Sequence, residues 1–430
     1  MKSASGMFLA GAGSRLLPPS IPFRFFGAAV ACHLLAWLAL LVGAEDVPRF
    51  AGGLGWPLAA LHLITLGVLA MTAIGASLQL LPVATRRGVG AARWPAALWW
   101  LYAVGVAMLA LGMGIASPRL LAAGAMATIV ALAVYAALLA RNLVGARGMP
   151  VVVAHVWVAL AALIVVIVTA LSLAGSYIGA PGLDRTTALV LHIAYATCGF
   201  VGMLAFGLSH ILVPMFALSA ASDERKAFAS VALAVTALLL VGALAFGIAP
   251  RVTGIGAIGA GAAAVVVHVR LMANALATGM RRRLGRSFVL VRIAWALLGV
   301  SLVAGLGVLL DAPLDGSSTL LILLLVGGWL LTFLLGILER IVPFLAAMHA
   351  GQRKLPGKRL PPTPSALTAD RPLAIHFRCH LAALALLAVA VIADSAWTVR
   401  LAAVVGAAGA LAFANFFVVA LRRMNVTEAR

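Results

Sequence analysis

Long apolar runs recur along the whole 430-residue chain, and they are the feature that most restricts its fold. An apolar run of about 20 residues is long enough to cross a bilayer as a helix. The chain contains twelve such runs. They lie near 24–43, 57–83, 95–116, 119–141, 151–175, 187–217, 227–249, 253–279, 288–310, 318–344, 373–393 and 396–421. The sequence therefore predicts an all-α, polytopic membrane protein with 12 transmembrane helices in a single transmembrane domain, 1–430.

The composition excludes a soluble globular enzyme and a disordered chain. Only 10% of the residues are charged and 64% are hydrophobic, whereas about a quarter of a soluble domain is charged. The net charge of +20 could suggest nucleic-acid binding. The basic residues, however, lie at the ends of the apolar runs rather than on a soluble module. We therefore expect a lipid bilayer as the partner and no nucleic acid.

The distribution of Lys and Arg predicts the orientation of the chain. With the N-terminus inside, only five of the 31 basic residues fall in outer loops, Arg340 lies within an apolar run, and 25 remain inside. The five are Arg49, Arg119, Arg185, Arg251 and Arg400. Because cytoplasmic loops carry the excess of positive charge, we expect a bacterial inner-membrane protein with both termini in the cytoplasm. The small residues at 42–44 leave open a cleaved signal peptide in place of the first helix.

A Gly-x6-Pro pattern occurs near the inner ends of the second, sixth and tenth runs. Its three copies are Gly75 to Pro82, Gly207 to Pro214 and Gly336 to Pro343. Small residues let membrane helices pack closely, but packing alone does not explain a spacing of four runs between copies. The spacing predicts a pseudo-threefold repeat of four-helix units, approximately 20–145, 150–285 and 286–425. The second, sixth and tenth helices are therefore the candidates for carrying a site.

Two histidines near the outer ends of these helices are the best metal-ligand candidates. They are His62 in the second run and His192 in the sixth. A neutral imidazole is a common axial ligand of haem iron, and two helices can each offer one. His62 lies 13 residues before its repeat glycine and His192 lies 15 before, so the positions are not equivalent. The alternative is a pair of interfacial histidines in contact with water.

A polar cluster is predicted near the inner ends of the same helices. His210 and Glu339 each follow their repeat glycine by three residues, and Arg340 and Gln79 follow theirs by four. Ionisable residues within a membrane are costly and are functional candidates for that reason. The cluster could form a proton or ion path. It could also be structural, with Arg340 extending toward lipid phosphates.

The remaining histidines give weaker signals. His376 and His380 lie four residues apart on one face of the eleventh run, so they could bind a metal such as copper. They could equally be basic residues at the membrane surface. His33, His155 and His268 stand alone in their runs and are expected to be packed or interfacial.

The motifs of the first two runs resemble those of the NnrS family. The segment Pro22-Phe23-Arg24-Phe25-Phe26 opens the first run, and His62-x4-Gly67-x7-Gly75-x6-Pro82 fills the second. Leu212-Val213-Pro214-Met215-Phe216 is similar to a turn of the same family. NnrS proteins are twelve-helix bacterial membrane proteins linked to nitric oxide metabolism and reported to carry haem and copper. The pattern of the second run also resembles that of subunit I of haem-copper oxidases and nitric oxide reductases.

These resemblances imply haem b, with copper also possible, and an electron donor or a small gaseous ligand as partner. The sequence departs from both families. Leu63 follows His62 where NnrS proteins have Glu, and the runs at 227–249 and 318–344 lack the histidines that oxidases use there. Only His62 carries over, as the haem-ligand position of the second helix. A dioxygen-reducing centre is therefore not expected, and whether the protein is an enzyme stays open.

The leading interpretation is a haem-binding inner-membrane protein that acts in nitric oxide or respiratory metabolism. Two other classes remain. One is a transporter or exporter with an intramembrane polar site, because internal repeats are common among transporters. The other is an accessory subunit without a cofactor. A Soret band in the purified protein would separate the first interpretation from the other two.

Overall fold

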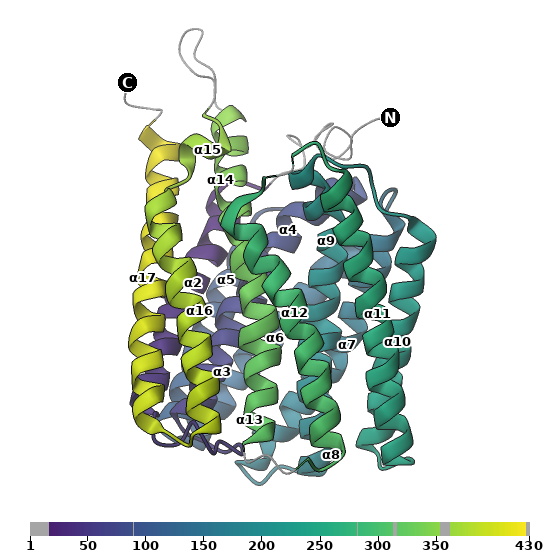
Figure 1. Cartoon of the computed structure of the whole chain (residues 1–430), viewed down its shortest axis with the longest axis vertical. Coiled ribbons are helices and arrows are strands. Elements are labelled where there is room, and N and C mark those ends of the chain that lie inside the picture. The colour runs from purple at the N-terminus through teal and green to yellow at the C-terminus, as the bar shows by residue number, and fades with distance from the viewer. Residues whose placement is uncertain (1–16, 89, 282, 313–315, 353–361, 427–430) are drawn as a thin grey trace.

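The computed structural model describes residues 17–426 apart from 89, 282, 313–315 and 353–361. In the described part of the chain, twelve helices are long and apolar enough to cross a membrane, and they form one upright bundle (Figure 1). The predicted fold class is thereby confirmed, and each predicted apolar run corresponds to one of these spans.

The spans other than the second, sixth and tenth are single helices. They are α2 (Ser20–Val42), α5 (Arg93–Gly114), α6 (Pro118–Leu143), α7 (Pro150–Ser176), α10 (Glu224–Ala245), α11 (Pro250–Thr278), α12 (Gly285–Leu309), α16 (Asp370–Ile392) and α17 (Ala396–Val426). A short helix, α15 (Pro364–Leu367), precedes α16. Several of the spans begin with proline, which is tolerated in the first turn because the missing N–H would have no partner there.

The second, sixth and tenth spans are built differently, because each contains a π-helical segment. The second span is α3 (Trp56–His62), η2 (Leu63–Ala70) and α4 (Met71–Thr85), the sixth is α8 (Arg185–Ala194), η3 (Tyr195–Gly202) and α9 (Met203–Ala217), and the tenth is α13 (Ser317–Ile322), η4 (Leu323–Leu331) and α14 (Thr332–Gln352). Each π-helical segment ends five residues before the repeat glycine. Such segments are rare and concentrate at functional sites.

The repeat glycines pack in the same way in all three units. A Cβ placed on Gly75, Gly207 or Gly336 would lie 2.7, 2.7 or 3.1 Å from the Cβ of Phe25, His155 or Leu290, respectively. These partners lie on α2, α7 and α12, the first helix of each predicted four-helix unit. A second layer repeats the arrangement, with Gly67 against Cys32, Gly199 against Ala162 and Gly328 against Leu297. The glycines therefore let the inner span approach the first helix of its own unit at equivalent heights.

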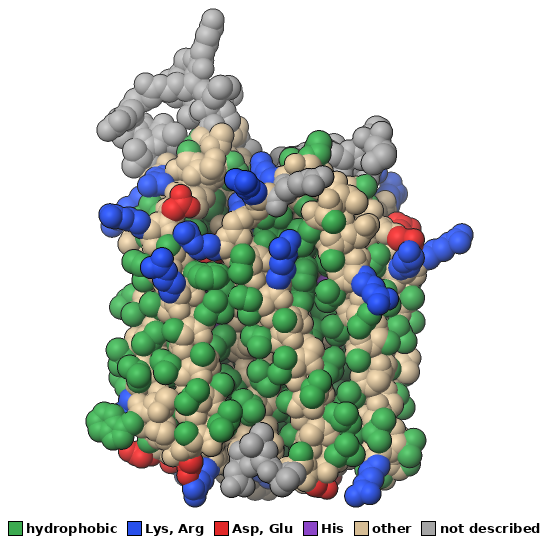
Figure 2. All heavy atoms as spheres, viewed as in Figure 1, with side chains coloured by type: hydrophobic (Ala, Val, Ile, Leu, Met, Phe, Trp, Pro, Cys, Tyr) green, Lys and Arg blue, Asp and Glu red, His purple; other side chains and the backbone are tan. Residues whose placement is uncertain are grey.

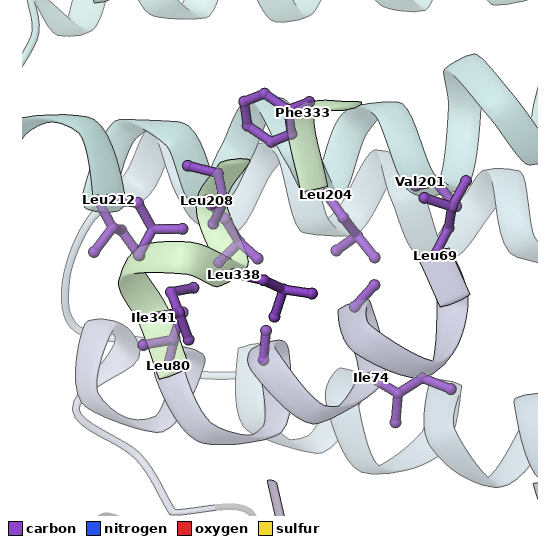
Figure 3. Close-up of a cluster of buried hydrophobic side chains, with 14 of the residues drawn as sticks. Leu69, Ile74, Leu80, Val201, Leu204, Leu208, Leu212, Phe333, Leu338 and Ile341 are labelled. Carbon is purple, nitrogen blue, oxygen red and sulfur yellow. The ribbon is translucent and has the colours of Figure 1, made fainter. Parts of the chain in front are cut away.

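The three inner spans pack against one another through apolar side chains at the centre of the bundle. Figure 3 shows Leu69 of the second span beside Val201 of the sixth, and Leu80 of the second span beside Ile341 of the tenth. The tenth span extends further than the apolar run predicted. Because α14 continues to Gln352, His349 lies within this span and not beyond it. The prediction that the tenth helix lacks histidine was therefore wrong.

The surface of the bundle matches a membrane environment. On the face in view, Lys and Arg side chains gather toward one end and hydrophobic side chains cover the middle (Figure 2). Large apolar side chains such as Val303 and Trp397 are 71% and 78% exposed. Because the number of spans is even, the start of the first span and the end of the last span lie at the same end of the bundle (Figure 1). Which side faces the cytoplasm, and where the repeat units begin and end, remain predictions.

Candidate functional site

Histidines from distant parts of the sequence gather inside the bundle. Eight of the nine histidines form three groups. We call them the outer pair (His62 and His192), the first trio (His33, His376 and His380) and the second trio (His155, His210 and His268). The ninth, His349, lies near Gln79 and Phe23. Each group joins histidines of different spans.

The outer pair brings together the two histidines that the sequence singles out. His62 is the last residue of α3, directly before η2, and His192 lies on α8, three residues before η3. Their ring centroids are 6.5 Å apart and their ring planes differ by 25°. The two histidines lie at different distances from their repeat glycines, but this difference does not prevent the contact between their rings. Helices related by a pseudo-threefold axis face each other through non-equivalent surfaces, so residues that meet need not be equivalent.

Hydrogen bonds fix which nitrogen of each ring is free. Nδ1 of His62 lies 3.0 Å from the backbone oxygen of Leu58, which can only accept, so Nδ1 carries the hydrogen. Nδ1 of His192 lies 3.2 Å from the hydroxyl oxygen of Thr169. That hydroxyl donates to the carbonyl groups of Val165 and Val166, and therefore accepts from His192. In the neutral rings Nε2 is then unprotonated, as a metal ligand requires.

In the second and sixth spans, the part that carries His62 or His192 is more exposed than the part that follows the π-helical segment. Every residue of α4 is buried, whereas Leu61, His62 and the segment 64–66 are only partly buried. The segment 192–196 of the sixth span behaves in the same way. An apolar cavity of about 130 Å³ lies beside Leu61 and Ile64, between α2, the second span, the tenth span and α16. The cavity is apolar and lies on the side of the second span that faces the tenth span and α16.

The first trio is fully buried, which overturns the expectation that His376 and His380 could lie at the membrane surface. His33 and His376 have ring centroids 6.1 Å apart, and His376 and His380 are 5.6 Å apart. The indole N–H of Trp37 donates to Nε2 of His33, so a neutral His33 carries its own hydrogen on Nδ1. His33 then has no free lone pair for a metal. The first trio can offer at most two ligands.

The second trio comes from three helices, α7, α9 and α11. The ring centroids of His155 and His210 are 5.4 Å apart, as are those of His210 and His268. Phe206 stacks on His268 with ring centroids 3.9 Å apart and planes 2° apart. This group could not be predicted from the sequence, because His155 and His268 are each isolated in their runs. The sequence feature closest to this group is Gly207, whose lack of a side chain permits the close approach of α7.

The predicted inner polar cluster is divided in the structure. His210 belongs to the second trio, while Arg340 donates to the hydroxyl of Ser287 and to the backbone oxygen of Leu284. Gln79 accepts from the backbone N–H of Leu17 and lies near His349. Oε1 of Glu339 and Nε2 of His210 are both buried without a hydrogen-bond partner, so these two atoms are not bonded to each other.

Comparison with solved structures identifies a protein of similar fold. The fold of this chain is similar to that of a haem-copper terminal oxidase. The solved structure, described as that of a heme-copper terminal oxidase dimer, matches with a TM-score of 0.60 at 13% identity, over 96% of this chain and 85% of the oxidase chain. No protein-family model and no curated protein matches. The resemblance to NnrS therefore stays a prediction, and what this chain binds has to be argued from its own histidines.

Proposed function

We propose that the protein is a haem-binding inner-membrane protein in which His62 and His192 are the two axial ligands of one b-type haem. We propose further that it acts in nitric oxide or respiratory metabolism, with both termini in the cytoplasm. The observation that carries the proposal is the outer pair itself, two histidines of two inner spans that face each other in a fold similar to that of an oxidase.

The separation of the rings supports axial ligation. A bond of about 2 Å between a metal and an imidazole nitrogen puts the centroids of two rings on opposite sides of one metal roughly 6 Å apart. The observed separation is 6.5 Å. The hydrogen bonds to Leu58 and Thr169 supply the outer-shell contacts that usually orient ligating histidines. The residues of the site therefore hold both rings before any group binds.

The surroundings also suit a flat, apolar macrocycle. The partly buried residues at 61, 62, 64–66 and 192–196 leave apolar side chains near the pair. When bound, a haem with two histidine ligands supplies one-electron transfer. If His62 and His192 both held the iron, the haem would carry an electron from a donor, and this is the proposed role.

The apolar cavity beside Ile64 offers a place for a small partner. Its volume of about 130 Å³ is close to that of a cavity known to hold one benzene ring. Val326, Leu323 and Leu387 line it together with Ile64. A small apolar gas such as nitric oxide matches this lining better than a charged substrate, and this favours a gaseous ligand over a transported ion.

Haem content tests the proposal. The purified protein should contain about one haem per chain by the pyridine haemochrome assay, with a Soret band. His62→Ala and His192→Ala should each lower haem content to below about a tenth. His380→Ala, which removes a buried histidine of the first trio, is the matched control and should leave haem unchanged. A colourless wild-type protein, or full haem content in both outer-pair variants, would overturn the proposal and favour a transporter or an accessory subunit.

A further inference from the structure

We infer that Arg270, Arg292 and Arg378 form a row that binds the headgroup phosphates of anionic phospholipids. The three arginines lie on α11, α12 and α16, respectively. The inference does not rest on the proposed haem. It rests on the depth of the three side chains in the bundle, on their exposure beside apolar residues and on the lack of an acidic partner.

The three arginines lie at nearly the same depth. Arg292 follows the first residue of α12 by seven positions, Arg378 follows the first residue of α16 by eight, and Arg270 precedes the last residue of α11 by eight. These three helix ends lie at one end of the bundle, where the first span also starts (Figure 1). At a rise of about 1.5 Å per residue, each arginine lies about 10–12 Å from that helix end.

This depth places the arginines below the lipid headgroups. With its 29 residues, α11 is about 43 Å long, which is roughly the thickness of a whole bilayer with its headgroups. The headgroup region takes up only about 5–8 Å on each side of the hydrocarbon core. The Cα atoms of the three arginines therefore lie at the level of the lipid chains, where a guanidinium group finds little water.

All three side chains are exposed, and they stand among apolar ones. Val289 precedes Arg292 by three residues and is 43% exposed. Ile375 precedes Arg378 by three residues and is 52% exposed. Both apolar residues are closer to the end of the bundle than the arginine that follows them. Figure 2 shows the same mixture on the face in view, where Lys and Arg side chains lie among hydrophobic ones over α16, α12 and α11. The row therefore lies within the lipid-facing apolar surface and not beyond it.

No acidic side chain neutralises the row. Within the described part of the chain, the three guanidinium groups form neither an ion pair nor a hydrogen bond. At the opposite end of the bundle, by contrast, Arg49 pairs with Asp394. Arg400 likewise pairs with Glu45 there. A charge inside a membrane is costly unless it has a partner of opposite sign or reaches the headgroups, so the row needs an anion from outside the chain.

The chemistry of arginine selects this anion. Its guanidinium group donates pairs of hydrogen bonds to phosphate oxygens, and its long apolar stem lets the charged head extend along the helix toward the headgroups. A phospholipid supplies a phosphate at the level just above the row. Choline and ethanolamine headgroups carry a positive charge of their own, whereas phosphatidylglycerol does not. Three unbalanced positive charges therefore favour a phospholipid of net negative charge.

Lipid binding is measured on the detergent-purified full chain. The protein is titrated with phosphatidylglycerol or with phosphatidylcholine, and bound lipids are counted by native mass spectrometry. The wild type should bind phosphatidylglycerol more tightly than phosphatidylcholine, and added salt should reduce the difference. Arg270→Gln, Arg292→Gln and Arg378→Gln should each weaken phosphatidylglycerol binding by about fivefold. Phosphatidylcholine binding should stay unchanged in all three.

Two further variants separate the row from charge in general and from a structural role. Arg251→Gln removes one positive charge from the exposed surface near the opposite end of α11, and it should bind phosphatidylglycerol like the wild type. Arg292→Lys keeps the charge and should retain most of the binding. Monodisperse elution shows which variants are folded, and where the glutamine variants fail to fold, the comparison of the two lipids on the wild type still decides.

Four results would overturn the inference. The wild type could bind the two lipids equally. Folded glutamine variants of all three arginines could bind phosphatidylglycerol as tightly as the wild type. Arg251→Gln could weaken the binding as much as they do, or Arg292→Lys could lose as much of it as Arg292→Gln.

Discussion

Replacing Gly207 by alanine should push α9 away from α7, and the structure sets the size of the effect. The new Cβ would lie 2.7 Å from the Cβ of His155, which is fixed to its backbone and cannot rotate away. Carbon atoms pack at about 3.5–4.0 Å, so the helices must separate by about 1 Å. Enlarging a residue in a packed core costs about 1–3 kcal/mol. Gly75→Ala should cost as much, because Phe25 stands at the same distance.

Gly299→Ala is the matched control. Gly299 lies in α12, and a Cβ there would meet nothing within 4 Å. Alanine favours a helix over glycine by about 1 kcal/mol in aqueous hosts, so the control should be neutral or stabilising. The assay is the temperature at which half of the detergent-solubilised protein loses its monodisperse elution peak. Gly207→Ala should lower it by several degrees relative to the control. A midpoint equal to that of Gly299→Ala would refute the account of the repeat glycines.

Three further predictions concern topology, pH and reactivity. A reporter fused after Arg147 should be active in the cytoplasm and one fused after Gly182 in the periplasm; the reverse would contradict the orientation inferred from the basic residues. Hydrogen bonds from Thr187 hold the pKa of Asp184 below its ordinary value of 3.8. Asp184→Ala should therefore lower the melting midpoint at neutral pH, and the difference should vanish as the pH falls through that lowered pKa; a difference that persists at lower pH would count against the cap. The purified protein should not consume dioxygen, because two histidines fill both axial positions of the proposed haem. Cyanide-sensitive oxygen uptake with an electron donor would contradict this.

The fold could be predicted because its signals are local in sequence. The length of each apolar run fixes a span, and the spacing of Gly75, Gly207 and Gly336 reveals the repeat. The π-helical segments could not be predicted, since no residue type marks them. The extension of α14 to Gln352 could not be predicted from hydropathy, because the apolar run ends near residue 344, whereas the helix continues past Pro343.

The site could be predicted only in part. Depth along the helix singled out His62 and His192, although their distances from the repeat glycines, 13 and 15 residues, differ. Neighbouring helices of a threefold arrangement face each other through different surfaces, so two residues that meet need not hold equivalent positions. The second trio could not be predicted from the sequence, because His155, His210 and His268 converge only when α7, α9 and α11 pack together. The spacing of residues within one apolar run gives no information about contacts between different helices.

The state of the haem iron tests the central claim most directly. Two imidazole ligands make oxidised haem iron low-spin, and loss of one leaves it five-coordinate and high-spin. Low-temperature electron paramagnetic resonance of the oxidised wild-type protein should therefore show a low-spin signal. His62→Ala and His192→Ala should each replace it by a high-spin signal in any haem that remains, and added imidazole should restore the low-spin form. A high-spin signal in the wild type, or an unchanged low-spin signal in both variants, would contradict the assignment of the outer pair as haem ligands.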